Sequence, residues 1–266
     1  MNLGVDKIYA INLNRFKERK KNIIQISKDL DIDIDIVTGF DNKEHTPIQD
    51  SPLLKHLPNK FWDPNGWITL GIICCALSHR KAYKKFLESN AEIALFLEDD
   101  VRITEHIYKY NFNDVRNELD TLDWGVCWYG KYVDKIITGE SITSNLSKAE
   151  PHYKGQYAGH AYVLNRKSAE WFYNNTKTVK YAADVRLEIS PFKQVSLDNS
   201  VFVQRQVDHY VHQMKVHDEM FHNTLEDAEY DEDNDIVRSD LLPIKSYNKK
   251  SFGVGNKTLP GWEFLF

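Results

Sequence analysis

A five-residue apolar run followed directly by three consecutive acids is the feature that most constrains the fold of this chain. Residues 93–97 are Ile-Ala-Leu-Phe-Leu, and Glu98, Asp99 and Asp100 follow directly. A short apolar run bounded by polar residues is typical of a strand covered on both faces. This pattern predicts an α/β fold in which helices pack on a sheet. Ligands of open α/β sheets bind beyond the carboxyl ends of the strands, where these acids would lie.

The acidic triplet predicts a metal site. Carboxylates packed so closely repel one another and raise one another's pKa. A hard divalent cation relieves that repulsion, and carboxylate oxygens are the ligands that it prefers. We therefore expect a metal site that holds a phosphorylated ligand. The alternative is that the acids solvate the turn or cap a following helix, since short motifs often match by chance.

Composition describes a globular chain with no strong charge bias. It has 266 residues, 42% of them hydrophobic, and a formal net charge of −5, which gives no attraction to nucleic acid or to anionic membranes. No apolar run approaches the ~20 residues of a membrane-spanning helix, and Met1–Asp6 lack the pattern of a signal peptide. The cysteines Cys74, Cys75 and Cys127 do not suggest a disulfide framework. We expect a cytoplasmic protein. A position at a membrane face, beside its acceptor, is one form of this expectation.

The start of the chain has the pattern of a strand–helix–strand unit. Lys7–Leu13 and Asp33–Thr38 are the expected strands, and Arg15–Leu30 between them is a basic amphipathic helix. Such a unit implies that the two strands pair in parallel.

The rest of the chain is expected to complete one α/β domain with a less regular C-terminal part. A catalytic domain over residues 1–210 would carry a C-terminal extension, 211–266, packed on the same domain and containing an acidic loop at 226–235. The other expected elements are helices over Thr69–Ser89, over Glu105–Leu119 and beginning in Ser168–Tyr173, strands over Trp124–Tyr129 and Ala158–Leu164, and loops over 41–68 and Lys135–Tyr153.

Several segments together resemble glycosyltransferase family 25, the lipooligosaccharide and procollagen galactosyltransferase type. They follow the family's order over roughly residues 5–205. The resemblance departs at Ile72 and Cys74, where the family carries Glu and Gly. The matching segments are Tyr9-Ala10-Ile11-Asn12-Leu13-Asn14-Arg15 with Arg19, then Thr69–His79 with its Cys-Ala-Leu-Ser-His, Leu97-Glu98-Asp99-Asp100-Val101, Ala161-Tyr162-Val163-Leu164 with Ser168-Ala169, Ala183-Asp184, and Val201-Phe202-Val203-Gln204.

The resemblance implies a GT-A-like, Rossmann-type mixed sheet flanked by helices, a UDP-sugar donor, and Mn²⁺ or another divalent cation. Asp100 is then the expected main metal ligand, or else the N-cap of a following helix. In an extended strand Glu98 points to the same side as Asp100, and Asp99 to the other. One of Glu98 and Asp99 would hold the ribose or the donor sugar instead of metal.

Three residues near the first strand are candidates for binding the nucleotide. Arg15 and Arg19 follow that strand, where phosphates often lie in α/β folds, and the planar fork of a guanidinium suits a diphosphate. Asn12 could reach the base or the ribose. The alternatives are a solvated basic helix face for the arginines and a turn cap for Asn12.

The helix that contains Ser78 and His79 offers two further donor-binding candidates through the resemblance. His79 lies on the apolar stripe of that helix, one turn from Tyr83. A half-buried histidine there equally well has its hydrogen bonds satisfied within the core, and the same holds for Ser78.

Inverting sugar transfer needs a base that takes the proton of the acceptor hydroxyl. Asp184 is the first choice and Glu188 the second, because four residues of helix would place both on one face. The alternative for Asp184 is to cap that helix. His209, His212 and His217 are candidates for a further metal ligand, or else plain surface residues.

The function expected from these residues is metal-dependent, inverting transfer of a hexose, galactose or glucose, from a UDP-sugar. The acceptor would be a glycan, a lipooligosaccharide or hydroxylysine of a glycoprotein. An inactive sugar-binding or scaffold protein of the same fold is the alternative, although intact acids argue against a relaxed site. A nucleotidyl- or phosphotransferase also uses clustered acids and metal, but no Gly-rich phosphate loop follows the first strand.

Overall fold

The computed structural model describes residues 1–41, 70–130, 139–149, 159–176, 179 and 182–204. The chain divides into two units, Met1–Arg205 and Gln206–Phe266. The helices and strands of the described residues all belong to the first unit. The boundary expected at residue 210, the acidic loop 226–235, the loop over 41–68 apart from residue 41, and the three histidines His209, His212 and His217 lie outside the described residues and stay predictions.

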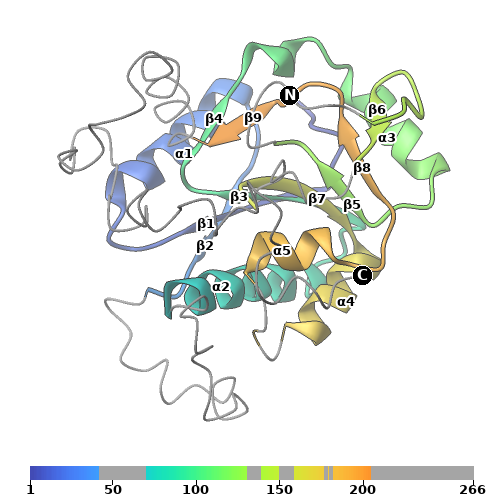
Figure 1. Cartoon of the computed structure of the whole chain (residues 1–266). Coiled ribbons are helices and arrows are strands. Elements are labelled where there is room, and N and C mark those ends of the chain that lie inside the picture. Colours follow the sequence, from blue (N-terminus) through green and yellow to red (C-terminus); the bar gives the residue numbers. More distant parts are fainter. Residues whose placement is uncertain (42–69, 131–138, 150–158, 177–178, 180–181, 205–266) are drawn as a thin grey trace, which may run out of the picture. The chain divides into compact units, whose positions relative to one another are not determined.

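A seven-stranded mixed sheet forms the centre of the first unit (Figure 1). In spatial order the strands are β2 (Asp35–Thr38), β1 (Lys7–Asn12), β3 (Ile93–Glu98), β7 (Ala161–Asn165), β5 (Val126–Trp128), β8 (Gln194–Leu197) and β6 (Leu146–Lys148).

Strand directions change on passing from β3 to β7. The strands β2, β1 and β3 are parallel, β7 runs antiparallel to both β3 and β5, β8 is parallel to β5, and β6 is antiparallel to β8. A separate antiparallel pair joins β4 (Val101–Ile103) to β9 (Phe202–Gln204). The expected parallel pairing of the first two strands, and the α/β class with a mixed sheet, are confirmed.

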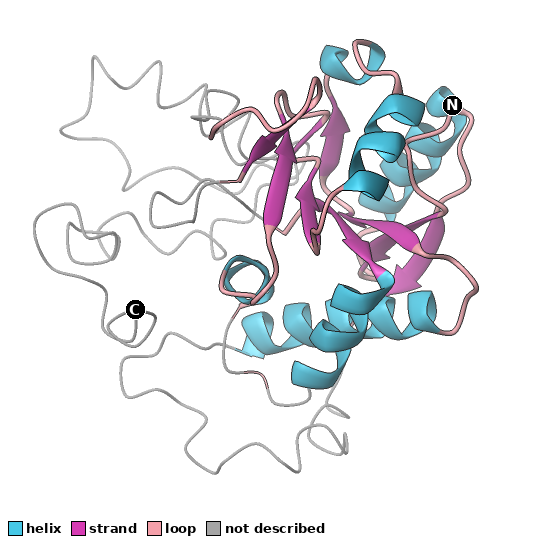
Figure 2. Cartoon of the chain, turned by 90° about the vertical axis from the view of Figure 1, so that its right-hand side faces the viewer, coloured by secondary structure: helices cyan, strands magenta, loops and turns pink. Residues whose placement is uncertain are grey.

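Helices cover both faces of the sheet (Figures 1 and 2). One face carries α1 (Lys17–Leu30) and α3 (Phe112–Thr121), and the other carries α2 (Leu70–Leu87), α4 (Arg166–Asn175) and α5 (Ala183–Glu188). Within the described residues, none of the helices combines the length and apolarity needed to cross a membrane.

The alternation of side chains along β1 and β3 explains why both faces are covered. Ile8 and Leu95 join the core beneath α1 and α3, whereas Tyr9 and Phe96 join the core beneath α2 and α4. The rings of Tyr9 and Phe96 stack with their centroids 5.8 Å apart. Because both faces are apolar, the strands read as continuous hydrophobic runs in the sequence.

Arg166 holds α2 against the sheet. Its guanidinium donates hydrogen bonds to the carbonyls of Leu87, Ser89 and Ala91, at and just beyond the end of α2. Cations are favoured at helix C-termini, where carbonyls lack partners within the helix. This contact fixes the helix that supplies His79.

Two expectations about secondary structure were wrong. The single helix expected over Glu105–Leu119 is a 3-10 helix, η2 (Glu105–Tyr108), followed by α3, because the side chain of Asn111 accepts a hydrogen bond from Asn113 N and starts a new helix. The stretch over Lys135–Tyr153, expected to be polar and loop-rich, contains the edge strand β6, which was not foreseen. The strand β6 is too short and too polar to show a strand pattern in the sequence.

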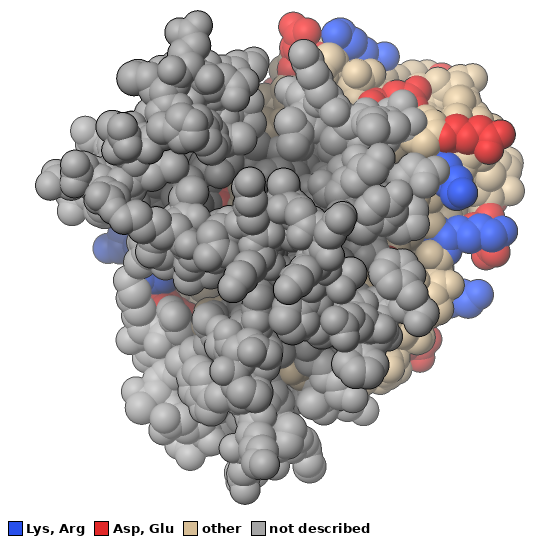
Figure 3. Space-filling view, viewed as in Figure 1, with Lys and Arg blue, Asp and Glu red and all other residues tan. Residues whose placement is uncertain are grey.

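The surface shows no concentration of one charge where it can be seen. In the space-filling view of Figure 3, the described Lys and Arg side chains along the right margin lie beside Asp and Glu side chains. This mixture agrees with the modest net charge of −5.

Candidate active site

The acidic triplet lies at the carboxyl end of β3, beside the change of strand direction. Glu98 is the last residue of β3, and the chain turns at Asp99 and Asp100 before β4 begins. The strict alternation expected of an extended strand therefore ends at Glu98. Clefts at the carboxyl ends of strands, where strand order changes, are the usual ligand sites of α/β sheets.

Asp99 is embedded in contacts with the first strand and helix. One carboxylate oxygen accepts a hydrogen bond from Asn12 Nδ2 at 2.6 Å and lies 3.4 Å from Leu13 N. The other lies 3.3 Å from Arg19 Nη1. Burial raises the pKa of Asp99, although the charge of Arg19 and the Asn12 hydrogen bond oppose that shift. Asp99 thus ties β3 to β1 and α1.

Asp100 has one satisfied and one unsatisfied oxygen. Its Oδ2 accepts a hydrogen bond from Gln204 Nε2 at 3.1 Å and lies 3.5 Å from Arg19 Nη1. Its Oδ1 is buried without a hydrogen-bond partner among the described residues. Burial, together with the charges of Glu98 and Asp99, raises the pKa of Asp100 to about 7. A buried, unpaired carboxylate oxygen is costly and is the kind of group that a bound cation would satisfy.

Glu98 faces α2. Its Oε1 lies 3.2 Å from His79 Nε2. Burial alone would raise the pKa of Glu98, but the His79 hydrogen bond and the positive charges of His79, His160 and Arg19 together hold that pKa below its usual value. Glu98 is therefore ionised at neutral pH and contributes to the raised pKa of Asp100.

Asp184 reaches the same place from α5, so the condition on which Asp184 and Glu188 were paired, a helical segment, is met. A Cβ placed on Gly159 would lie 3.4 Å from Glu98 Oε1, 3.7 Å from His79 Cε1 and 3.8 Å from Asp184 Cβ. These three side chains thus surround a space that the missing side chain of Gly159 leaves open. A group placed there would contact Glu98, His79 and Asp184 together.

Burial raises the pKa of both candidate bases. For Asp184 the charge of Glu98 adds to this effect, and a hydrogen bond from Val185 N at 2.8 Å opposes it. The alternative role of Asp184 as the helix cap was wrong, because Ala182 is the N-cap of α5 and Asp184 lies within the first turn. For Glu188, burial and the charge of Asp184 raise the pKa to about 9.

His79 is held by a chain of aromatic hydroxyls. Its Nδ1 lies 2.6 Å from Tyr162 Oη, which in turn lies 2.7 Å from Tyr83 Oη. The rings of His79 and Tyr162 stack with centroids 5.7 Å apart. These contacts fix the orientation of the imidazole and direct Nε2 toward Glu98. His79 is accordingly both a core residue and a lining of the site.

Ser78 and Arg15 lie beside the site with partners of their own. The Ser78 hydroxyl donates to Cys74 O at 2.6 Å and accepts from Phe40 N at 2.8 Å. Arg15 Nε lies 2.8 Å from Asp41 Oδ2, and the Arg15 guanidinium covers the ring of Phe16 at 4.4 Å. The expected contacts of these two residues with a donor stay predictions.

The structure thus brings Glu98, His79 and Asp184 around one space at Gly159. Asp99 and Asp100, which follow Glu98, contact Arg19 instead. Sequence reasoning missed Gly159 and Gln204 as parts of this site. Gly159 comes two residues before the family-like Ala161-Tyr162 segment, which was its only signal. Gln204 closes the segment Val201–Gln204 and meets Asp100 across 104 residues of sequence.

Known proteins resemble most of this chain. The model for glycosyltransferase family 25 (LPS biosynthesis protein) matches residues 5–187, which contain every described candidate residue except Glu188. Procollagen galactosyltransferase 2 of Homo sapiens is 28% identical over 173 residues, covering 63% of this chain and 27% of the relative. A glycosyltransferase 25 family member of Aedes aegypti is 30% identical over 136 residues, covering 48% and 22%.

These relatives are much longer proteins, and the chain spans about a quarter of the length of the curated relatives it matches. One solved structure is of a glycosyltransferase involved in the glycosylation of the major capsid of PBCV-1. It is 10% identical, covers 78% of this chain and 98% of its own, and superposes with a TM-score of 0.39. That superposition is too loose to carry an argument.

Proposed function

This chain belongs to glycosyltransferase family 25, and from that membership we propose that it transfers a hexose from a UDP-sugar to an acceptor hydroxyl with inversion at the anomeric carbon. We favour galactose over glucose because the relatives include procollagen galactosyltransferases. The acceptor is a hydroxyl of a glycan, of a lipooligosaccharide or of hydroxylysine in a collagen-like protein. A nucleotide-sugar donor follows from the family.

The buried Oδ1 of Asp100, which has no hydrogen-bond partner in the described part of the chain, is the observation that carries this proposal. Asp100 and Glu98 present carboxylates at one end of β3, and their mutual repulsion contributes to the raised pKa of Asp100. These two residues would hold Mn²⁺ or another divalent cation, as hard oxygen ligands do. When bound there, the cation would neutralise charge on the diphosphate leaving group.

Asp184 is the proposed general base. Its carboxylate takes the proton of the acceptor hydroxyl as the acceptor oxygen bonds to the anomeric carbon, and the bond to the UDP oxygen breaks on the opposite face. A base works best when its pKa lies near the working pH, and burial shifts the pKa of Asp184 in that direction. Glu188, with a pKa of about 9, is mostly protonated at pH 7 and is less suited to accept a proton.

The other residues position these groups. Asn12 and Arg19 hold Asp99, so that β3 enters its turn in one geometry. Tyr162 and Tyr83 hold His79 against Glu98. Gly159 keeps the space between Glu98, His79 and Asp184 open. These contacts preorganise the acids before any substrate arrives, which is the main route to electrostatic catalysis.

Thermal unfolding with a panel of UDP-sugars, with and without Mn²⁺, tests this proposal. A ligand that binds only the folded protein raises the midpoint. A ligand at about 100 times its dissociation constant stabilises by about 2.7 kcal/mol, which is roughly 5–10 °C for a chain of this size. We expect a rise with one UDP-sugar that needs Mn²⁺ and is lost in Asp100→Asn.

Release of UDP from that sugar, measured with Mn²⁺ alone and with candidate acceptors, separates an enzyme from a binding protein. Binding without any turnover would favour the inactive sugar-binding alternative. No shift of the midpoint with any UDP compound would overturn the proposal.

A further inference from the structure

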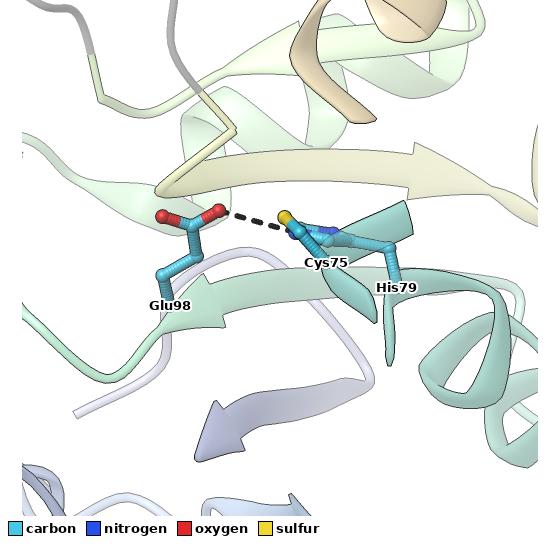
Figure 4. A group of neighbouring side chains, drawn as sticks. All are labelled: Cys75, His79 and Glu98. Carbon is cyan, nitrogen blue, oxygen red and sulfur yellow. Dashed lines mark hydrogen bonds and ion pairs between the residues drawn. The ribbon is translucent and has the colours of Figure 1, made fainter. Parts of the chain in front are cut away.

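A thiol, an imidazole and a carboxylate converge beside the acidic triplet. The ligand atoms of Cys75, His79 and Glu98 all lie within 4.8 Å of one another. Figure 4 shows Cys75 and His79 extending side by side from α2 toward Glu98 at the end of β3. Cys75 has no role in the transfer reaction proposed above.

The placement of these side chains follows from rigid elements. Cys75 and His79 are four residues apart on α2, and that spacing puts them on one face of the helix, about one turn apart. Glu98 ends β3, a strand paired on both sides. A site built from a helix face and a strand end is held more firmly than one built on loops.

His79 is oriented as a metal ligand commonly is. Its Nδ1 meets Tyr162 Oη at 2.6 Å, so Nδ1–H can donate to that hydroxyl while Tyr162 donates to Tyr83. The Nε2 of His79 lies 3.2 Å from Oε1 of Glu98 and hydrogen-bonds that oxygen in the metal-free protein. A cation bound between the two atoms would displace the shared proton and take the lone pair of Nε2. A hydrogen bond at the second ring nitrogen is the usual support of a metal-binding histidine.

The donor set selects the kind of cation. Sulfur, nitrogen and a single carboxylate oxygen suit Zn²⁺ and similar thiophilic ions, whereas Mn²⁺ and Mg²⁺ favour oxygen. Three protein ligands with an open fourth position are typical of Zn²⁺ sites that keep a water or another ligand.

The surroundings of Cys75 also favour a cation. The side chain is exposed, so an ion can reach the sulfur. The carboxylate of Glu98, which has an oxygen within 4.8 Å of the sulfur, adds a negatively charged ligand beside the thiol.

We propose that Cys75, His79 and Glu98 form a binding site for a thiophilic divalent cation such as Zn²⁺, next to the carboxylate site of Asp100 and sharing Glu98 with it. The two sites therefore compete for Glu98. Zn²⁺ bound at Cys75 and His79 draws Glu98 away from Asp100 and lowers the affinity of the carboxylate site for Mn²⁺. The competition for Glu98 rests on the proposed function, whereas the site formed by Cys75, His79 and Glu98 does not.

Cobalt titration of the full chain without any nucleotide tests the site. Co²⁺ bound to a thiolate gives a charge-transfer absorption that oxygen ligands do not give. We expect this band in the wild type, its loss on adding Zn²⁺, and its absence in Cys75→Ala. Cys74→Ala is the matched control, because the Cys74 side chain is buried and one residue along a helix points about 100° away. That control should bind Co²⁺ as the wild type does.

A second variant tests the orientation of His79. Tyr162→Phe removes the hydroxyl that meets Nδ1, and we expect Zn²⁺ affinity to fall roughly 10- to 100-fold while Cys75 remains. Circular dichroism and the unfolding midpoint show that each variant is folded. Wild-type protein without the charge-transfer band, or equal Zn²⁺ affinity in wild type and Cys75→Ala, would overturn the proposal. Because no UDP-sugar is present, this result is independent of the test of the transferase.

Discussion

The two sides of the acidic triplet differ in how far their polar groups are satisfied. On the α1 side, Asp99 meets Asn12, Leu13 N and Arg19, and its oxygens have protein partners. By contrast, Asp100 has an oxygen without a hydrogen-bond partner among the described residues, and Glu98 and Asp184 both border the space at Gly159. A satisfied network stabilises a fold, whereas buried acids without partners persist where a ligand completes them. Neighbouring acids of one motif thus have different roles.

The largest expected effect is on catalysis, and it separates the proposed base Asp184 from its neighbour Glu188. Asp184→Asn keeps the shape of the side chain but cannot accept the acceptor proton, so kcat should fall about 10²- to 10⁴-fold. Steady-state kinetics with UDP-galactose checks this, and the ligand-induced rise in unfolding midpoint should remain. Glu188→Gln is the control, because Glu188 with its pKa of about 9 is already protonated at neutral pH. If Glu188→Gln loses more activity than Asp184→Asn, the assignment of the base is wrong.

Substitution of Asp99, whose oxygens have protein partners, should lower the free energy of unfolding. Asp99→Ala removes the buried carboxylate that Arg19 and Asn12 contact, although Asp100 still lies 3.5 Å from Arg19. Breaking a buried pair costs up to about 3–5 kcal/mol of unfolding free energy. Urea unfolding followed by circular dichroism measures the change. Glu18→Ala removes an exposed partner of Lys21 and should have no measurable effect. A change of less than about 1 kcal/mol in Asp99→Ala would contradict the structural role of Asp99.

Asp100, which has an oxygen without a described hydrogen-bond partner, should make the free energy of unfolding depend on pH. The pKa of Asp100 is raised from its ordinary value to about 7, so the folded protein binds a proton there that the unfolded chain has released. The stabilisation from Asp100 is therefore present at low pH and is lost as pH rises from about 4 to about 7. We expect a loss on the order of a few kcal/mol in this interval.

The matching experiment compares urea unfolding at several pH values in wild type and Asp100→Asn. The variant cannot titrate, so this part of the pH dependence should disappear and its stability above pH 7 should exceed that of the wild type. Mn²⁺ with a UDP-sugar should likewise weaken the pH dependence in the wild type. Equal pH profiles of unfolding free energy in the two proteins would show that folding does not raise the pKa of Asp100.

The smallest expected change in stability concerns the open space itself. In Gly159→Ala the new Cβ would make ordinary contacts of 3.4–3.8 Å with Glu98, His79 and Asp184. Folding should therefore be little affected, while room for a ligand is lost. We expect an unfolding midpoint near that of the wild type and a clearly smaller rise with UDP-sugar and Mn²⁺. An unchanged response to ligand would place the ligand elsewhere.

The sequence predicted those parts of the molecule that local patterning determines. The apolar run 93–97 and the strand–helix–strand opening appear as expected, because one strand or one amphipathic helix is visible within a short window. The helix over Glu105–Leu119 failed for a local reason, since Asn111 works as a cap that the apolar spacing did not reveal. The edge strand β6 is too short and polar to be distinguished from a loop.

The division of labour within the site could not be predicted. Asp99 and Asn12 are 87 residues apart in sequence, and Asp100 and Gln204 are 104 apart. The sequence around the acidic triplet does not indicate which of its carboxylates will receive hydrogen bonds from such distant partners. Gly159 acts through the absence of a side chain, and Cys75 through its distance to Glu98. Each of these depends on tertiary packing.

Electron paramagnetic resonance of Mn²⁺ tests the central claim most directly, because the signal of free Mn²⁺ weakens when the ion binds. With UDP-galactose present, we predict that wild-type protein binds Mn²⁺, that Asp100→Asn does not, and that folded Glu188→Gln binds it as the wild type does. Undiminished Mn²⁺ binding by Asp100→Asn would contradict the claim that the unpaired oxygen of Asp100 is a ligand for the cation.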